Sequence, residues 1–268
     1  MLGVQSTVIE DPLTRPQTFT YHLFIISTVL IAGAGNAIND YFDLRADRLN
    51  RPKSMVIGKR LKRRWAIIVH WGFNALGLVI SIRLCVQLHT WFFLFIHLFS
   101  ATVLWVYSIY IKKVVFWSNA IISMLIAIVP LSSMIFFMIL EVKMRYIELI
   151  VSISITAFIV NLAREILKDI QDIEGDRLIL VRSLPMVLGE KTTRYITAFL
   201  CFGVWVPFGL AMYLKIFPMY SLFCTVYAFS SVFCSSVGLL SLMKVSSGNL
   251  ALLLKISMLF AVISMFLL

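Results

Sequence analysis

Long apolar stretches follow one another along almost the whole chain, and they decide what it can fold into. A helix of roughly 20 apolar residues crosses about 30 Å of hydrocarbon, so each stretch predicts one membrane span. With 60% hydrophobic and only 14% charged residues, a soluble domain is excluded and an all-α polytopic membrane helical bundle is predicted. We place eight spans, at residues 20–43, 64–87, 90–111, 115–140, 146–170, 193–214, 217–243 and 249–268.

We expect one domain and no separate soluble module beside these spans. Residues 1–19 are polar and lack the basic, apolar and cleavage regions of a signal peptide. We therefore divide the chain into a polar N-terminal segment, 1–19, and one transmembrane domain, 20–268. The four cysteines lie in apolar runs without C-x-x-C spacing, which favours a packing role.

Basic residues are distributed unequally between the connections. The odd-numbered connections carry 18 lysines and arginines and the even-numbered ones carry four. The positive-inside rule then places the odd connections in the cytoplasm, in a protein integral to the cell or inner membrane. We therefore explain the net charge of +11 by orientation in the lipid bilayer and by anion binding. It implies no nucleic acid and no protein partner. Eight spans would leave the N-terminus outside, so we expect a further helix upstream and a truncated or mis-started chain.

Two acidic motifs interrupt the apolar pattern, one at the end of the first predicted span and one at the end of the fifth. Each reads D-x-x-D-x-x-x-D, is followed at once by an arginine, and leads to a proline and a glycine further on. These matching contexts indicate a parallel internal duplication, which transporters also use. The first motif contains Asn39, Asp40, Asp43 and Asp47, and the second contains Lys168, Asp169, Asp172, Glu174 and Asp176.

Helical spacing places the carboxylates of each motif on one face. At about 100° per residue, Asn39, Asp43 and Asp47 lie within about 80° of one another. The second motif does the same together with Glu165, one turn earlier, and we expect Gly175 to fray the end of that helix. Eight of the 13 acidic residues gather in these two places. Like charges near an apolar interior repel one another and are poorly solvated, so a cationic ligand is predicted.

Magnesium suits these motifs because it prefers oxygen ligands and is commonly held by one or two carboxylates together with phosphates. We predict that the motifs hold magnesium ions and a diphosphate between them. Calcium and zinc suit the chain less, since it has no EF-hand loop and no histidines at zinc-type spacing. The alternative is that each motif is a solvated helix end paired with nearby arginines. The basic residues expected on the diphosphate are Arg51, Lys59, Lys112 and Lys168.

The motifs resemble those of the UbiA family of intramembrane prenyltransferases, from residue 20 to the end of the chain. The resemblance implies nine spans around a central cavity and magnesium-dependent condensation of a prenyl diphosphate with a lipophilic acceptor. It also implies a Tyr/Lys element on the diphosphate, matched here by Tyr107 and Lys112. The implied magnesium ligands are Asn39, Asp43 and Asp47 in the first motif and Asp169, Asp172 and Asp176 in the second, with Asp40 added from its helical position. Asp43, Asp47, Asp172 and Asp176 are the expected catalytic residues.

The chain departs from the family pattern in two ways. The family usually has a helix before the first motif, and we expect none within the residues that precede it here. In addition, Arg51-Pro52 is not followed by a second Arg-Pro. The region of the second motif is most similar to enzymes that put a geranylgeranyl group on geranylgeranylglyceryl phosphate. Prenyltransferases acting on aromatic acceptors, such as 4-hydroxybenzoate or quinone precursors, are the next alternative. Two alternatives from another functional class remain. The protein is then a membrane transporter or an inactive, truncated paralogue of these enzymes.

Overall fold

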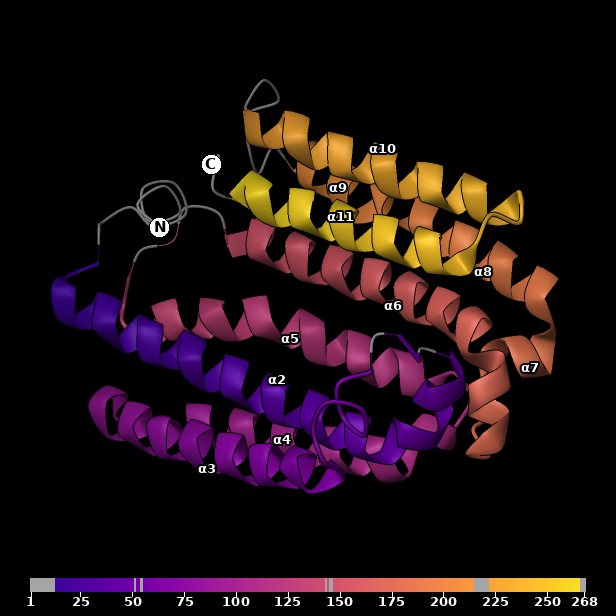
Figure 1. The fold of residues 1–268 in the computed structure, drawn as a ribbon. Helices are drawn as coiled ribbons and strands as arrows, with labels where there is room; N and C mark the ends of the chain where they lie inside the picture. The colour runs from indigo at the N-terminus through magenta and orange to yellow at the C-terminus, as the bar shows by residue number, and fades with distance from the viewer. Residues whose placement is uncertain are drawn as a thin grey trace. The chain divides into compact units, whose positions relative to one another are not determined.

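The computed structural model describes residues 13–50, 52–53, 55–142, 144, 147–214 and 222–265. Within these ranges every regular secondary-structure element is a helix, with only isolated bridge residues such as the pair Ile57 and Leu61, so the all-α prediction is confirmed (Figure 1). The elements are α2 (Arg15–Asn50), α3 (Arg63–Leu88), α4 (Phe92–Ile109), the 3-10 turn η1 (Ile111–Lys113), α5 (Trp117–Ile139), α6 (Ile147–Leu178), α7 (Leu184–Leu188), α8 (Glu190–Gly203), α9 (Trp205–Tyr213), α10 (Leu222–Leu242) and α11 (Ser247–Met265).

Seven stretches of the described helices are long and apolar enough to cross a membrane. They correspond to the first seven predicted spans, and the sixth is formed by α8 and α9 together, with a break at Val204. The eighth predicted span, 249–268, corresponds to α11, whose apolar described part, Ser247–Phe260, is shorter. Residues 1–12 of the predicted polar segment, 217–221 of the seventh span and 266–268 lie outside the described residues.

The chain divides into two compact units. The first comprises Thr14–Ser118 and Asp172–Ser183, which contain α2, α3, α4, η1 and the last turns of α6. Here α2 packs on α3 and α4. Glycines permit a close approach: a Cβ at Gly35 would lie 2.7 Å from Leu104, and one at Gly77 would lie 3.0 Å from Ile31. Small residues allow such tight helix packing in membranes.

The second unit contains α5, most of α6, and α7 to α11. Its core is built from the facing sides of α6, α8, α10 and α11, and α10 packs on both α8 and α11. The fully buried members of this core are Ala163, Leu167, Cys201, Cys234, Leu250 and Leu254. Two of the four cysteines thus serve as packing residues, as predicted.

A buried arginine joins the start of α8 to the end of α10. The Arg194 guanidinium donates from Nη1 to the carbonyl oxygens of Ser241 and Val245, both at 3.1 Å. Its Nε donates to Glu190 Oε1 at 2.8 Å. The last carbonyls of a helix lack partners within the helix, and the helix dipole favours a cation there. Arg194 therefore holds the turn between α10 and α11.

Replacing Arg194 with alanine should lower the melting temperature of the purified protein. Hydrogen bonds to charged groups contribute about 1.5–3 kcal/mol each, and this change leaves the buried Ser241 carbonyl and the partly buried Val245 carbonyl without their donor. The measurement is thermal unfolding in detergent, followed by intrinsic fluorescence. Lys191→Ala, an exposed position on the same helix, is the matched control and should leave the melting temperature unchanged. Equal melting temperatures for the two variants would contradict this role for Arg194.

Candidate active site

The two acidic motifs occupy the carboxyl-terminal ends of the two longest described helices. With 36 residues in α2 and 32 in α6, these helices are about 54 and 48 Å long at 1.5 Å per residue. Both exceed the roughly 30 Å of a hydrocarbon core, so their last turns can extend beyond it. The carboxyl end of a helix already carries a partial negative charge. Carboxylates placed there add to that charge, and cations are needed to offset it.

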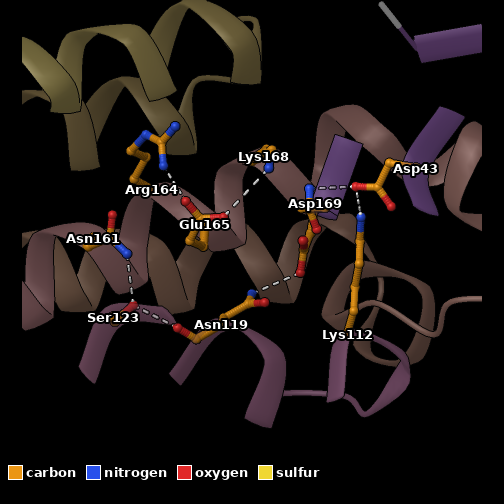
Figure 2. Close-up of polar contacts among 10 residues, drawn as sticks. Asp43, Lys112, Asn119, Ser123, Asn161, Arg164, Glu165, Lys168 and Asp169 are labelled. Carbon is orange, nitrogen blue, oxygen red and sulfur yellow. Dashed lines mark hydrogen bonds and ion pairs between the residues drawn. The ribbon is translucent and has the colours of Figure 1, made fainter. Parts of the chain in front are cut away.

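Asp43 is the centre of the first motif. Its side chain is buried on α2, where its Oδ2 accepts a hydrogen bond from Asn39 Nδ2 at 2.8 Å. The same oxygen forms an ion pair with Lys112 Nζ, which η1 supplies 69 residues later (Figure 2). Because only the amide nitrogen of Asn39 can donate to a carboxylate, its Oδ1 faces away. That buried oxygen has no hydrogen-bond partner among the described residues.

The other predicted residues of this unit differ in their exposure to solvent. Asp47 and Tyr107 are half-buried, and Asp40 is exposed. Lys59 is exposed, and its Nζ donates to the carbonyl oxygen of Pro52 at 3.2 Å. Its ammonium therefore lies along the connection between α2 and α3. The predicted diphosphate ligand Arg51 lies outside the described residues.

The first half of the second motif is braced from α5. Asn119 Nδ2 donates to Asp169 Oδ2 at 2.8 Å (Figure 2). One turn earlier, the buried Glu165 forms ion pairs with Arg164 and, at 3.8 Å, with Lys168. Two cations thus share one carboxylate, which leaves a net positive charge beside Asp169. Helical spacing predicted that Glu165 shares the acidic face of the motif. In the structure its carboxylate is paired with two basic side chains, Arg164 and Lys168.

The second half of the motif is held by Asn50, the last residue of α2. Its Nδ2 donates to the carbonyl oxygen of Asp172 at 3.1 Å, and its Oδ1 accepts from the backbone N–H of Gly175 at 2.9 Å. The prediction that Gly175 frays the helix is wrong, because α6 continues to Leu178. The Asp176 side chain is buried, with 5% of its surface exposed.

Sequence reasoning missed Asn50, although a signal for it was present. Asn50 follows Asn39 by 11 residues, which is about three helical turns and leaves it within about 20° of the same face. It therefore continues the line of polar side chains formed by Asn39, Asp43 and Asp47. The motif that resembles the UbiA family runs from Asn39 to Pro52 and includes Asn50, but the resemblance implied no ligand or positioning role for this asparagine.

The side chains present suit magnesium, which water and phosphate oxygens can help to coordinate. They suit less well a metal ion that is bound by protein side chains alone. No group of three or more histidine, cysteine or acidic side chains lies close enough to enclose a metal ion in the part of the chain that the structure describes. The donors that the motifs offer are carboxylate and amide oxygens, one of them the partnerless Asn39 Oδ1. Magnesium is usually completed by water and substrate phosphates, so a sparse oxygen set is what it requires.

Comparison with known families decides where the chain belongs. The model of the UbiA prenyltransferase family matches residues 11–237, which is most of the chain and includes both acidic motifs. The chain belongs to the UbiA prenyltransferase family. The resemblance that the motifs indicated is therefore confirmed.

Several UbiA relatives of this chain are digeranylgeranylglyceryl phosphate synthases. The one from Thermococcus gammatolerans is 34% identical over 182 residues, which cover 68% of this chain and 60% of the relative. The one from Methanosarcina mazei is 33% identical over 175 residues, covering 65% and 57%. The matched part of the chain thus spans about 60% of the first of these relatives.

Solved UbiA structures share the fold. A structure of digeranylgeranylglyceryl phosphate synthase is 25% identical with a TM-score of 0.59, covering 93% of this chain and 85% of its own. The apo UbiA homologue from Aeropyrum pernix is 18% identical with a TM-score of 0.70, covering 98% and 93%. The homologue from Archaeoglobus fulgidus bound to GPP and Mg²⁺ is 13% identical with a TM-score of 0.57, covering 98% and 92%. These likenesses, with the apolar helices, establish an integral membrane protein of the UbiA fold.

Proposed function

We propose that this protein transfers a prenyl group from a prenyl diphosphate to a lipophilic acceptor in a magnesium-dependent reaction. The observation that carries the proposal is the cluster of Asn39, Asp43 and Lys112. It places two kinds of oxygen donor beside an ammonium group at the end of a membrane helix. A metal ion bound to a diphosphate needs both, because the oxygens bind the cation and the ammonium binds the anion. Family membership supports the same reaction.

The acidic residues are the proposed magnesium ligands. Asn39, Asp43 and Asp47 would act from α2 with Asp40 nearby, and Asp169, Asp172 and Asp176 would act from α6. Magnesium, when bound, neutralises the charge that builds on a departing diphosphate. The chain's own part is to fix the oxygens in place, which the hydrogen bond from Asn39 to Asp43 does for the first motif. Asn119 does the same for Asp169.

The basic residues are the proposed diphosphate ligands. Lys112 would exchange its contact with Asp43 for one with the phosphates once a metal ion takes over that carboxylate. Lys168 lies 3.8 Å from Glu165, too far for a hydrogen bond, so Glu165 does not satisfy its donors. Tyr107, Lys59 and Arg51 complete the proposed set. The apolar surroundings would protect the allylic cation from water until the acceptor attacks.

We further propose geranylgeranyl diphosphate as the donor and geranylgeranylglyceryl phosphate as the acceptor. The support comes from the names of the relatives and from the net positive charge of Arg164, Glu165 and Lys168, which suits an acceptor carrying a phosphate. Arg164 Nε is buried without a hydrogen-bond partner in the described part of the chain. The excess of basic residues in the odd connections supports a site that faces the cytoplasm.

The test is an assay of the protein in lipid nanodiscs with geranyl, farnesyl and geranylgeranyl diphosphates. Each donor is paired with geranylgeranylglyceryl phosphate or with 4-hydroxybenzoate, and products are identified by mass spectrometry. We expect product from the geranylgeranyl donor with the glyceryl phosphate, lost with EDTA and restored by magnesium. Product with the aromatic acceptor alone would reassign the acceptor. Thermal stabilisation by magnesium and donor without any product would indicate a binding protein, because a ligand stabilises the folded state that binds it.

A further inference from the structure

Asn50 is bonded to the main chain of α6 and not to its side chains. Its amide spans from the Asp172 carbonyl oxygen to the Gly175 N–H, as donor to one and acceptor from the other. Both distances, 3.1 and 2.9 Å, are ordinary for such bonds. Main-chain atoms do not titrate, so the contact fixes the helix itself and is independent of the charge on any carboxylate. The sequence separation is more than 120 residues, which makes this a tertiary contact.

Gly175 leaves room for the Asn50 amide because it has no side chain. A Cβ at position 175 would lie 2.3 Å from Asn50 Nδ2, 2.6 Å from its Cγ and 2.7 Å from its Oδ1. Every other residue would therefore displace the Asn50 side chain. Glycine inside a helix costs roughly 0.5–1 kcal/mol relative to alanine. The helix bears that cost at the one position where the missing side chain makes room for Asn50.

The two joined points lie within one turn of proposed ligands on both helices. Asn50 comes three residues after Asp47, and Gly175 lies between Asp172 and Asp176. Magnesium demands near-ideal octahedral geometry with ligands at about 2.0–2.1 Å, so small errors in the separation of two ligand groups weaken its binding. Supporting residues outside the ligand set commonly change metal affinity by about 10- to 100-fold when they are removed.

We propose that Asn50 and Gly175 form a positioning pair that sets the separation of the two acidic motifs and thereby the affinity for the metal–diphosphate. The inference rests on the proposed function, since it assumes that the motifs share a metal-bound diphosphate. Neither residue touches the reacting atoms. Their effect is exerted through Asp172 and Asp176, whose helix they hold against the end of α2.

The experiment measures Mn²⁺ binding by electron paramagnetic resonance in detergent, with inorganic pyrophosphate as the anion. We expect Asn50→Ala to raise the dissociation constant for Mn²⁺ by about 10- to 100-fold per folded protein. Gly175→Ala should do the same, because the new Cβ drives the amide away. Gly72→Ala is the matched control: a Cβ there meets nothing within 4 Å, and affinity should remain at the wild-type value. Folded protein is quantified by size-exclusion chromatography before each titration.

The double variant Asn50→Ala/Gly175→Ala separates positioning from general damage. Without the amide there is nothing for the new Cβ to strike, so the double variant should bind Mn²⁺ as well as Asn50→Ala alone. Additive losses would overturn the pairing. A lower melting temperature with unchanged Mn²⁺ affinity in both single variants would show a merely structural role and overturn the inference. If the wild-type protein binds no Mn²⁺, the proposed function fails instead, so the two failures are distinguishable.

Discussion

Replacing Asp43 or Asp172 with alanine is expected to abolish magnesium-dependent prenyl transfer while the protein still inserts and folds. Each change removes a proposed oxygen ligand from a different motif. Asp43→Ala also leaves the ammonium of Lys112 without its carboxylate partner. Losing one preorganised electrostatic group at a reaction centre typically costs about 10²- to 10³-fold in rate. Initial rates should therefore fall by at least that factor at every magnesium concentration.

Glu174→Ala is the matched control for these variants. Glu174 is an exposed carboxylate two residues after Asp172, on the same helix end, and is not among the proposed ligands. It should keep nearly the wild-type rate, which would show that the loss depends on position and not on net charge. A near-wild-type rate for Asp43→Ala or Asp172→Ala would refute the assignment of the site.

Lys112→Met is expected to slow transfer and also to destabilise the metal-free protein. Transfer should slow by about 10²-fold, because the proposed ammonium contact with the diphosphate is lost. The metal-free protein should also be less stable, by about 3 kcal/mol, since breaking a buried ion pair leaves a carboxylate unpaired. The side chains of Lys112 and Asp43 are only 18% and 8% exposed. Magnesium should restore part of the lost stability, because it can replace the ammonium beside Asp43.

The measurement for Lys112→Met is the rise in melting temperature on adding magnesium without diphosphate. We expect a larger rise for this variant than for the wild type, where the metal must compete with the resident ammonium. Lys113→Met, at the adjacent exposed position, is the control and should match the wild type. If magnesium raises the melting temperature of all three proteins equally, the Lys112 ammonium does not compete with the metal for the Asp43 carboxylate.

The sequence predicted the spans well because a membrane imposes one strong length requirement on each helix. It placed the ends of α2 and α6 poorly. The predicted spans stopped at residues 43 and 170, whereas the helices continue to Asn50 and Leu178. These last turns are polar, so they carry no hydrophobic signal. They nevertheless carry Asp47 of the first motif and Asp172 and Asp176 of the second.

The candidate site was predicted as a set of residue types and not as a set of contacts. Helical periodicity is local, and it brought Asn39 together with Asp43 correctly. It could not predict the contact of Lys112 with Asp43, which are 69 residues apart in the sequence, or that of Asn50 with Gly175, which are 125 residues apart. Such contacts depend on how separate helices pack, which spacing along one helix does not encode. The metal and diphosphate roles of these residues stay predictions.

The position of the carboxylates on α2 and α6 has a consequence for the life of the protein in its membrane. Acidic groups at the negative poles of two helices impose a standing electrostatic cost whenever their counter-ions are absent. Bound cation and substrate would remove that cost, and mass action then ties the folded fraction to their supply. Under the proposed function, cells short of the prenyl diphosphate donor would hold this protein in its most easily degraded form, and its abundance would follow the supply of that donor.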